Sequence, residues 1–302
     1  MGHTHAGGED ESGKGKRLLI ALALNVGITV AQIVGGVISG SLSVLADAAH
    51  NASDAASLGI SYGAWRVSKR RPDQHRTFGY RRAETIGALI NLTTLFVIAL
   101  YLLYEAGNRF LHPQDVGGWT MIIVGVIAAV EDALSVWVLS KDRGSLNVKS
   151  AFLHMIADTM ATVGVIIGGV LILLFGITWV DPLITAAIAI YIFIHAFHEI
   201  RSAIALLMES APKDFDVDRM VAEMTSMAAV EGVHHVHVWQ LDEGRTAVEA
   251  HVAVSERDLA AADRIRRGLK DMLRDRFGVA HATLEVEFAQ DVRHDRSLIR
   301  QE

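Results

Sequence analysis

The chain has 302 residues, of which 51% are hydrophobic and 21% are charged, and its formal net charge is −6. This composition excludes an ordinary soluble enzyme, gives no sign of a nucleic-acid partner, and indicates several membrane spans together with a smaller polar domain. Because cysteine is absent, disulfide bonds are excluded, and any metal site must use His, Asp, Glu or backbone oxygen as ligands.

The N-terminal segment, residues 1–16, is polar, charged and rich in glycine, which predicts a disordered tail. His3 and His5 in this tail could collect metal ions weakly, but we favour ordinary solvated disorder. The apolar segment that follows lacks a small-residue cleavage site. We therefore expect a true membrane span there and no removable signal peptide.

Six apolar segments follow the tail, each long enough to cross about 30 Å of hydrocarbon as an α-helix. They lie near residues 17–38, 43–66, 83–107, 118–140, 149–175 and 180–207. Gly35, Gly36, Gly168 and Gly169 offer small faces where neighbouring helices can approach closely. The pattern predicts a six-helix transmembrane domain over residues 17–210.

Basic residues are concentrated in alternate connections between these segments. The connection between the second and third segments is the most basic, with Arg66, Lys69, Arg70, Arg71, Arg76, Arg81 and Arg82. The tail and the fourth connection are also basic, whereas the first and fifth connections contain no Lys or Arg. Because basic loops stay on the cytoplasmic side of a membrane, we expect both termini to be cytoplasmic.

The composition changes after Pro212, where apolar residues first recur at helical spacing and then alternate as in strands. Helices are expected over 214–228 and 259–277, and strands over 233–241, 246–254 and 282–288, with a hairpin turn at 242–245. The order predicts a small cytoplasmic α+β domain with a three-stranded sheet over 211–290, followed by a charged tail over 291–302. Strand alternation predicts that His235 and His237 share one face and that His234 lies on the opposite one.

Two stretches of the same form stand out among the apolar segments: His50 with Asp54, and His154 with Asp158. A spacing of four places each pair on one face of a helix. Either pair alone could be a satisfied buried pair, but two copies in different spans favour a shared site, because an unpartnered charge in hydrocarbon costs at least about 2.5–3.5 kcal/mol. Two imidazoles and two carboxylates suit tetrahedral Zn²⁺ better than Mg²⁺ or Ca²⁺, with Co²⁺, Ni²⁺ and Cd²⁺ as competitors.

Three further acidic residues fall inside the apolar segments. Asp47 shares the helical face of His50 and could orient that imidazole or pass protons, or it could be a water-lined polar residue. Glu131 and Asp132 lie in the middle of the fourth segment. They could join a proton relay, although we favour a wet cavity or a pairing with a polar group on a neighbouring helix.

The acid–base chemistry of the pairs predicts a mechanism. A histidine must be neutral and an aspartate ionised to bind metal, and so metal and protons compete for one site. We expect a secondary transporter that exposes this site to each side in turn and exports Zn²⁺ against inward protons. An intramembrane metalloprotease would need a general base, and no Glu lies near either His–Asp pair. The remaining alternative is a metal sensor that signals through the histidine-rich cytoplasmic domain.

At these residues the chain resembles the cation diffusion facilitator family, and particularly its bacterial zinc-exporting branch. The resemblance is carried by residues 45–54, 77–84, 151–158 and 233–239 and covers nearly the whole chain. It implies six spans, a cytoplasmic ferredoxin-like domain, a homodimer in the bacterial inner membrane and Zn²⁺/H⁺ exchange. It also assigns the transported ion to His50, Asp54, His154 and Asp158.

The resemblance implies further sites. In the loop before the third span, Asp73 matches one metal ligand of some relatives, and His75 could compensate for the histidines that this chain lacks, although we favour a simple basic loop facing lipid. Arg82 and Glu209 match a charge pair that links the membrane and soluble parts.

In the soluble domain, His234, His251 and Glu287 match the ligands of a regulatory metal site at the dimer interface. His281 is close enough in sequence to contribute. The alternative is a polar sheet face with ordinary surface histidines, and we favour the metal site.

Overall fold

The computed structural model describes residues 25–68, 70–139, 146–242 and 244–290. Within these ranges the side chains of residues 58, 61, 64, 65, 68, 135–139, 146–155 and 157 lie outside the described part, as do both predicted tails with His3 and His5. The chain divides into two units, which are Met1–Gly63 with Gly87–Ile200, and Ala64–Ile86 with Arg201–Glu302.

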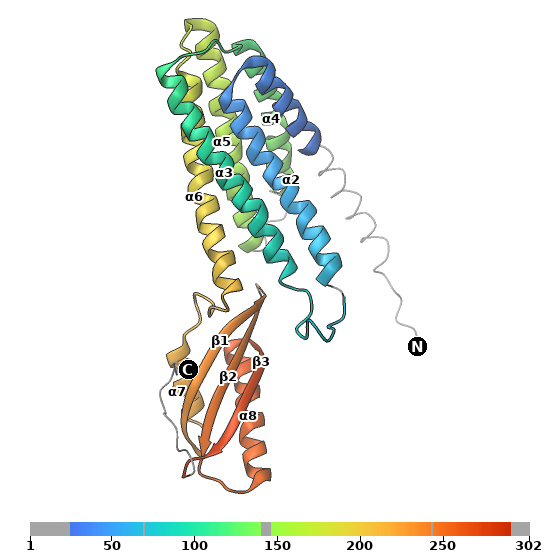
Figure 1. The fold of residues 1–302 in the computed structure, drawn as a ribbon, viewed down its shortest axis with the longest axis vertical. Helices are drawn as coiled ribbons and strands as arrows, with labels where there is room; N and C mark the ends of the chain where they lie inside the picture. Colours follow the sequence, from blue (N-terminus) through green and yellow to red (C-terminus); the bar gives the residue numbers. More distant parts are fainter. Residues whose placement is uncertain (1–24, 69, 140–145, 243, 291–302) are drawn as a thin grey trace, which may run out of the picture. The chain divides into compact units, whose positions relative to one another are not determined.

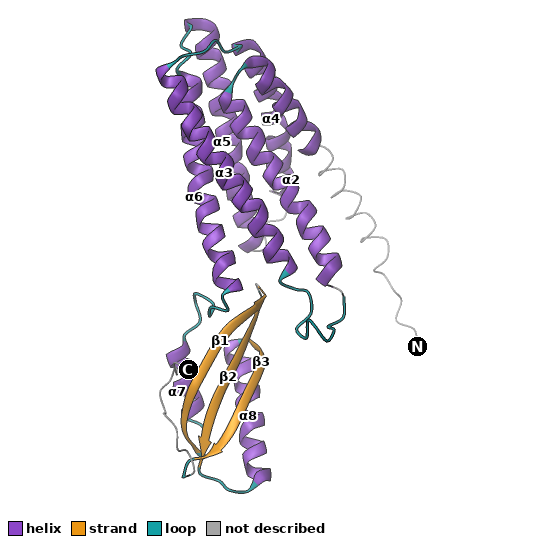
Figure 2. Cartoon of the chain, viewed as in Figure 1, coloured by secondary structure: helices purple, strands orange, loops and turns teal. Residues whose placement is uncertain are grey.

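The first unit is a helical bundle (Figures 1 and 2). Its helices are Asn25–Ser39, α2 (Leu42–Ser68), α3 (Ala83–Leu111), α4 (Gly118–Leu139), α5 (Leu146–Phe175) and α6 (Val180–Leu207). Each apolar segment of the sequence therefore forms a helix over the residues that the structure describes, and the ends of α3 and α6 agree with the expected spans to within a few residues.

Three stretches of helix are long and apolar enough to cross a membrane, among the residues that the structure describes. They are Ala83–Leu111, Asp158–Phe175 and Val180–Leu207, whereas Asn25–Ser39 is apolar but shorter. The prediction of six spans is thus not confirmed by these helices. The physical reason is plain for α2, because Asp47, His50 and Asp54 lower its mean hydropathy.

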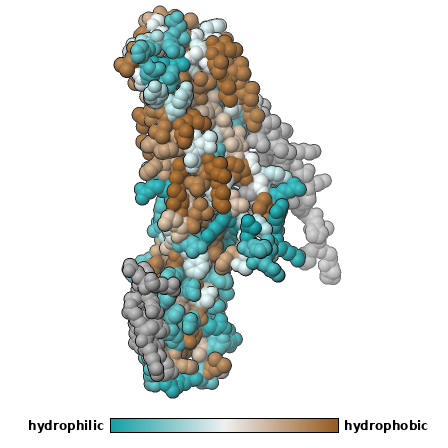
Figure 3. All heavy atoms as spheres, in the orientation of Figure 1, coloured by the Kyte–Doolittle hydropathy of each residue, from teal (hydrophilic) through white to brown (hydrophobic). Residues whose placement is uncertain are grey.

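Apolar side chains form the centre of the bundle and also cover its outside. The core joins all five labelled helices, through residues such as Val44, Leu95, Met121, Val165 and Ile192. Many large apolar residues are exposed on the helices, and Figure 3 shows hydrophobic residues over much of their outer surface. Such a surface suits contact with lipid and is unusual for a protein that faces only water.

The predicted small faces are places of close helix approach. A Cβ atom built on Gly35 would lie 2.4 Å from Cγ2 of Val124, and one on Gly168 would lie 2.5 Å from Cδ1 of Ile184. Between α4 and α5, a Cβ on Gly118 would lie 2.8 Å from the carbonyl oxygen of Gly169. Gly35 and Gly168 therefore leave room for an aliphatic side chain of a neighbouring helix, whereas α4 and α5 pack backbone against backbone, as small residues allow in membrane bundles.

A fully buried carboxylate holds the start of α2 against α6. Asp181, in the first turn of α6, accepts hydrogen bonds from the Leu42 and Ser43 N–H groups at 2.8 and 3.2 Å. It also accepts from the hydroxyls of Ser41 and Ser43 at 2.6 and 2.7 Å. The first N–H groups of a helix have no partners within the helix, and so a residue from another helix here supplies the cap of α2.

The residues after α6 form a three-stranded sheet covered by two helices. The elements are α7 (Val217–Thr225), β1 (Val230–Asp242), β2 (Arg245–Val254), α8 (Leu259–Phe277) and β3 (Val279–Phe288). Strand order is β1-β2-β3, with β1 antiparallel to β2 and β2 parallel to β3. The hairpin at 242–245 is confirmed, and α8 provides the crossover that a parallel pair needs.

Capping residues explain why the bounds of α8 agree with the prediction. The Asp258 side chain accepts from the Ala261 N–H at the first turn, and Gly278 ends the helix in a left-handed conformation with φ 65°. Met220 and Met224 of α7 and Leu269 and Leu273 of α8 pack with the sheet to form the core of this domain.

Candidate metal centres

The first site lies where α2 faces α5. Nε2 of His50 is 2.9 Å from Oδ1 of Asp158 and 3.9 Å from Oδ2 of Asp54. Ligand atoms of these three residues all lie within 4.8 Å of one another. The His50 side chain is only 8% exposed, against 40% for Asp54, and so the group has a buried end and an open end. Such an arrangement can bind a metal ion and still exchange it.

Helix spacing builds this group in a simple way. His50 and Asp54 are one turn apart on α2, and Asp158 comes from α5, whose close packing on α4 holds it in place. His154 lies one turn before Asp158 on α5, but its side chain lies outside the described residues. The fourth ligand of the predicted set therefore stays a prediction.

An aromatic residue that the sequence reasoning missed borders this group. The Tyr191 ring of α6 lies edge-on to the His50 ring, with centroids 6.3 Å apart, and His195 stacks on Tyr191 at the same separation. The spacing of four between Tyr191 and His195 places them on one face of α6, and this was the signal available in the sequence.

Asp47 connects α2 to the helix Asn25–Ser39. Gln32 donates from Nε2 to Oδ2 of Asp47 at 2.5 Å and accepts from Asn51 at 2.9 Å. Both Asp47 and Gln32 are buried. Asn51 is the neighbour of His50, and so the network fixes the turn of α2 that carries the imidazole. Gln32 was not singled out from the sequence.

Asp132 of α4 contacts α5, the helix that carries Asp158. The Thr162 hydroxyl lies 2.9 Å from Oδ2 of Asp132 and 3.1 Å from the carbonyl oxygen of Asp158. This contact agrees with the favoured expectation, in which the acidic residues of α4 pair with a polar group on a neighbouring helix. Glu131 precedes Asp132 and is half-buried.

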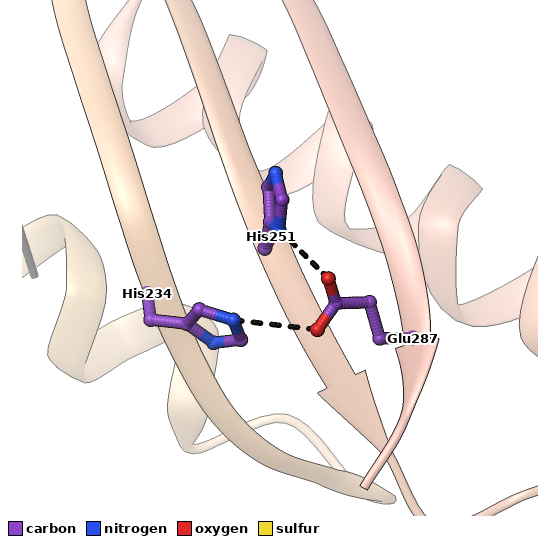
Figure 4. A group of neighbouring side chains, drawn as sticks. All are labelled: His234, His251 and Glu287. Carbon is purple, nitrogen blue, oxygen red and sulfur yellow. Dashed lines mark hydrogen bonds and ion pairs between the residues drawn. The ribbon is translucent and has the colours of Figure 1, made fainter. Parts of the chain in front are cut away.

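The second group lies on the sheet of the soluble domain (Figure 4). Oε1 of Glu287 is 2.7 Å from Nδ1 of His251, and Oε2 of Glu287 is 3.3 Å from Nε2 of His234. Ligand atoms of the three lie within 4.8 Å of one another, and His234 is buried. Each residue comes from a different strand, which pre-positions two imidazoles and a carboxylate for one ion.

A β-bulge alters the expected alternation of β1. The register with β2 shifts between His234 and His237, and His235 has a positive φ of 49°. As a result His234 and His235 both lie beside His251, with ring centroids 5.4 and 4.6 Å away. The prediction that His234 and His235 lie on opposite faces is therefore wrong, because the extra residue of a bulge re-aims the side chains that follow it.

The structure does not bring His281 to this group. In the sheet His281 lies beside Ala247, whereas His251 lies beside Glu285. Four residues along a strand span roughly 13 Å, and the His281 ring instead packs edge-on against Phe78 at 6.1 Å. The closeness of His281 and Glu287 in the sequence was misleading, because each residue of an extended strand adds roughly 3.3 Å to the distance between side chains.

Comparison with known protein families identifies the kind of protein that carries these two candidate metal centres. A family model described as the cation efflux transmembrane domain matches residues 18–208, and one described as the cation efflux protein cytoplasmic domain matches residues 212–289. The chain belongs to the cation efflux family, also called the cation diffusion facilitator family. It is therefore a membrane transporter of metal cations.

Curated relatives of this cation efflux protein span almost its full length. The chain is 31% identical to the "Cadmium, cobalt and zinc/H(+)-K(+) antiporter" of Bacillus velezensis, covering 99% of this chain and 95% of the relative. It is 34% identical to the "Metal cation efflux system protein CzcD" of Cupriavidus metallidurans, covering 95% and 89%. It is 32% identical to the "Zinc transporter ZitB" of Escherichia coli, covering 95% and 93%.

In this cation efflux chain, the loop before α3 is held by its own hydrogen bonds. Asp73 accepts at Oδ1 from the His75 and Arg76 N–H groups and at Oδ2 from the Tyr80 hydroxyl at 2.5 Å. The Tyr80 hydrogen bond and then those backbone bonds hold the pKa of Asp73 below its usual range. Asp73 and His75 form no metal-ligating group in the described part of the chain, because both oxygens of Asp73 close the loop.

The predicted charge pair is present. Nη2 of Arg82 lies 3.1 Å from Oε1 of Glu209. The two side chains are 35% and 61% exposed, and an exposed pair of this kind contributes only about 0–1 kcal/mol. The pair therefore adds little to stability, and its role as a link stays a prediction.

Proposed function

We propose that the protein exports Zn²⁺ from the cytoplasm across the bacterial inner membrane in exchange for protons, with both termini in the cytoplasm. The transported ion binds to His50, Asp54 and Asp158, and His154 completes a tetrahedral set. The convergence of a buried imidazole and two carboxylates from α2 and α5 carries this proposal. Relatives named as zinc transporters and as a cadmium, cobalt and zinc antiporter support zinc as one substrate.

The exchange of metal for protons follows from the ligand atoms. The 2.9 Å contact between His50 and Asp158 is a hydrogen bond only when a proton lies between the two side chains. A metal ion needs the lone pair of Nε2 and the charge of the carboxylate, and so binding requires that this proton leave. Protons arriving from the outer side restore the contact and expel the ion, which couples the two movements.

Access to the site must alternate between the two sides. Asp54 is the open end of the group, and Asp158 and His50 are its buried end. A rocking motion of α2 and α5 relative to their neighbours would close one route and open the other. The network through Asp47 and Gln32 keeps the ligand-bearing turn of α2 intact while the helix moves.

Zinc transport into proteoliposomes under an imposed pH gradient tests the proposal. We expect radiolabelled Zn²⁺ to accumulate with the wild type and to fall to the level of empty liposomes with Asp54→Asn or Asp158→Asn. Asp115→Asn makes the same change at an exposed aspartate and should leave transport unchanged. Zinc movement that survives both substitutions would remove the group from the mechanism, and no zinc movement by the wild type would favour a metal sensor.

The group of His234, His251 and Glu287 is proposed as a regulatory zinc site of a homodimer. Its donor set, two imidazoles and one carboxylate, suits Zn²⁺ and leaves a position for a ligand from elsewhere. Calorimetry with the Asp54→Asn, Asp158→Asn double variant isolates this site from the transport site. Zinc binding should persist there and disappear on adding His234→Ala, and binding that is indifferent to His234 would contradict the assignment.

A further inference from the structure

A basic cavity lies in the second unit, between the loop 70–82 and the β1–β2 hairpin. Its volume is about 460 Å³, and a neighbouring cavity of about 280 Å³ shares Phe78, Arg81 and Arg245 as walls. Neither metal group described above contributes a residue to these two cavities. The function proposed above therefore leaves them unexplained.

The lining carries an excess of positive charge. Among the described residues that line the two cavities, the only acidic one is Glu209, and the arginines are Arg70, Arg76, Arg81, Arg82 and Arg245. Arg82 is paired with Glu209, while Arg81 and Arg245 share the single carboxylate of Asp242 at 3.3 and 2.9 Å.

Two arginines are left for an anion. Arg70 and Arg76 have no ion pair with a described carboxylate, and their guanidinium carbons lie 6.0 and 4.8 Å from the centre of the Tyr80 ring. The nearest further acid, Asp73, spends both oxygens on its own loop and on the Tyr80 hydroxyl. Guanidinium groups present parallel N–H donors that match two oxygens of a phosphate, and they tolerate an apolar surrounding better than ammonium groups do.

Part of the remaining wall is apolar, and it lies beside the start of a span. Phe78, Trp239, Leu241 and Ile86 line the larger cavity, and the Phe78 side chain is exposed although it is aromatic. Ile86 belongs to the first turn of α3, which is one of the helices apolar enough to cross a membrane. The cavity therefore joins phosphate-binding groups to apolar surface at the level where lipid headgroups lie.

We propose that this cavity binds the phosphate group of an anionic phospholipid, with the guanidinium groups on the headgroup and the aromatic wall along the first part of the acyl chains. A headgroup bound to Arg70 and Arg76 would bring negative charge beside the pairs that Arg82 forms with Glu209 and that Arg81 and Arg245 form with Asp242. Lipid would then act on the charge pairs at the base of α3, which gives membrane composition a route to influence transport.

Native mass spectrometry of the full-length protein in detergent tests the proposal, with phosphatidylglycerol and phosphatidylcholine of identical acyl chains as probes. The wild type should retain phosphatidylglycerol in clear preference to phosphatidylcholine. Each basic side chain near an anionic lipid contributes about fivefold in affinity, and so Arg70→Gln, Arg76→Gln should weaken phosphatidylglycerol binding on the order of 30-fold. This double variant keeps every ion pair described around the cavity and should fold.

The matched control removes two arginines elsewhere in the same unit. Arg219→Gln, Arg267→Gln changes exposed residues of α7 and α8 and should leave phosphatidylglycerol binding unchanged. Equal losses in the two double variants, or equal retention of both lipids by the wild type, would overturn the proposal. Inorganic phosphate distinguishes the source of the anion, because displacement of phosphatidylglycerol by an equal concentration of phosphate would overturn the assignment to a lipid.

Discussion

The buried cap of α2 offers a direct test of how the bundle holds its metal ligands. Asp181→Ala removes a carboxylate that receives four hydrogen bonds, two from backbone N–H groups and two from serine hydroxyls. Each hydrogen bond to a charged group is worth about 1.5–3 kcal/mol. The contributions do not add, because Ser41 and Ser43 lie 3.2 Å apart and can bond to each other, and Val44 keeps its own bond to Ser41.

Two backbone N–H groups, those of Leu42 and Ser43, are then left buried without an acceptor. We therefore expect Asp181→Ala to lower the free energy of unfolding by about 3–5 kcal/mol, as when one member of a buried charged network is removed. Asp181→Asn keeps the shape and one acceptor oxygen, and should lose about half as much. The cap lies eight residues before His50, about 12 Å along the helix, and so zinc transport should fall as well.

Thermal unfolding in detergent, followed by circular dichroism, measures the effect. Asp115→Ala, at an exposed aspartate, is the matched control. The order wild type, Asp181→Asn, Asp181→Ala in decreasing melting temperature is expected, with the control beside the wild type. A melting temperature for Asp181→Ala within error of the control would refute the view that this carboxylate fastens α2 to α6.

Three further predictions concern selectivity, packing and pH. His50→Asp replaces an imidazole, a donor that suits tetrahedral Zn²⁺, by a carboxylate and should weaken the preference for Zn²⁺ over the larger Cd²⁺, measured by competition between the two ions in proteoliposomes; an unchanged preference would count against His50 as a ligand. Gly169→Ala places a Cβ atom 2.9 Å from Cγ1 of Ile122 and should lower the melting temperature. The control Gly164→Ala, on the same helix, places a Cβ atom with nothing within 4 Å and should leave the melting temperature unchanged or raise it slightly. Equal effects of the two substitutions would contradict tight packing of α4 on α5. Burial raises the pKa of Asp242, but hydrogen bonds from Arg245, the Gly244 N–H group and Arg81 outweigh this and lower the pKa. The stabilisation by this carboxylate is therefore present above the ordinary aspartate pKa of about 3.9 and is lost as pH falls below that value. Asp242→Asn should be destabilising at pH 7 in thermal unfolding, and the difference from the wild type should shrink as the pH is lowered below about 3.9; a difference that stays constant with pH would contradict this role.

Short-range patterns were the reliable guide in this chain. The spacing between His50 and Asp54 predicted a shared helical face, because the period of a helix depends only on backbone geometry. The helix over 259–277 was predicted from the spacing of its apolar residues, and the bounds of α8 agree because Asp258 and Gly278 cap it locally. Small residues in the apolar segments, such as Gly35, correctly indicated where helices meet.

Patterns that depend on neighbours in space were harder to interpret. Asp181 resembles an ordinary acidic residue in the first turn of a helix, a place where carboxylates are common, and nothing nearby in sequence points to α2. Gln32 is a single polar residue in an apolar segment, and its partners Asp47 and Asn51 come from another helix. The bulge at His235 depends on how β1 pairs with β2, and strict alternation cannot anticipate it.

Periodicity and side-chain chemistry in the sequence were enough to predict which segments are helices, that an α+β domain follows them, and that His50, Asp54 and Asp158 are residues of the type that can bind a metal ion. These conclusions rest on periodicity and on the chemistry of side chains, which are properties of neighbouring residues. Three features could be seen only once the chain was folded. Ligand atoms of His50, Asp54 and Asp158 from α2 and α5 lie within 4.8 Å of one another, His281 lies apart from His234, His251 and Glu287, and five arginines line one pair of cavities. Packing of distant segments sets these distances, because contacts between segments far apart in the chain leave no spacing in the sequence.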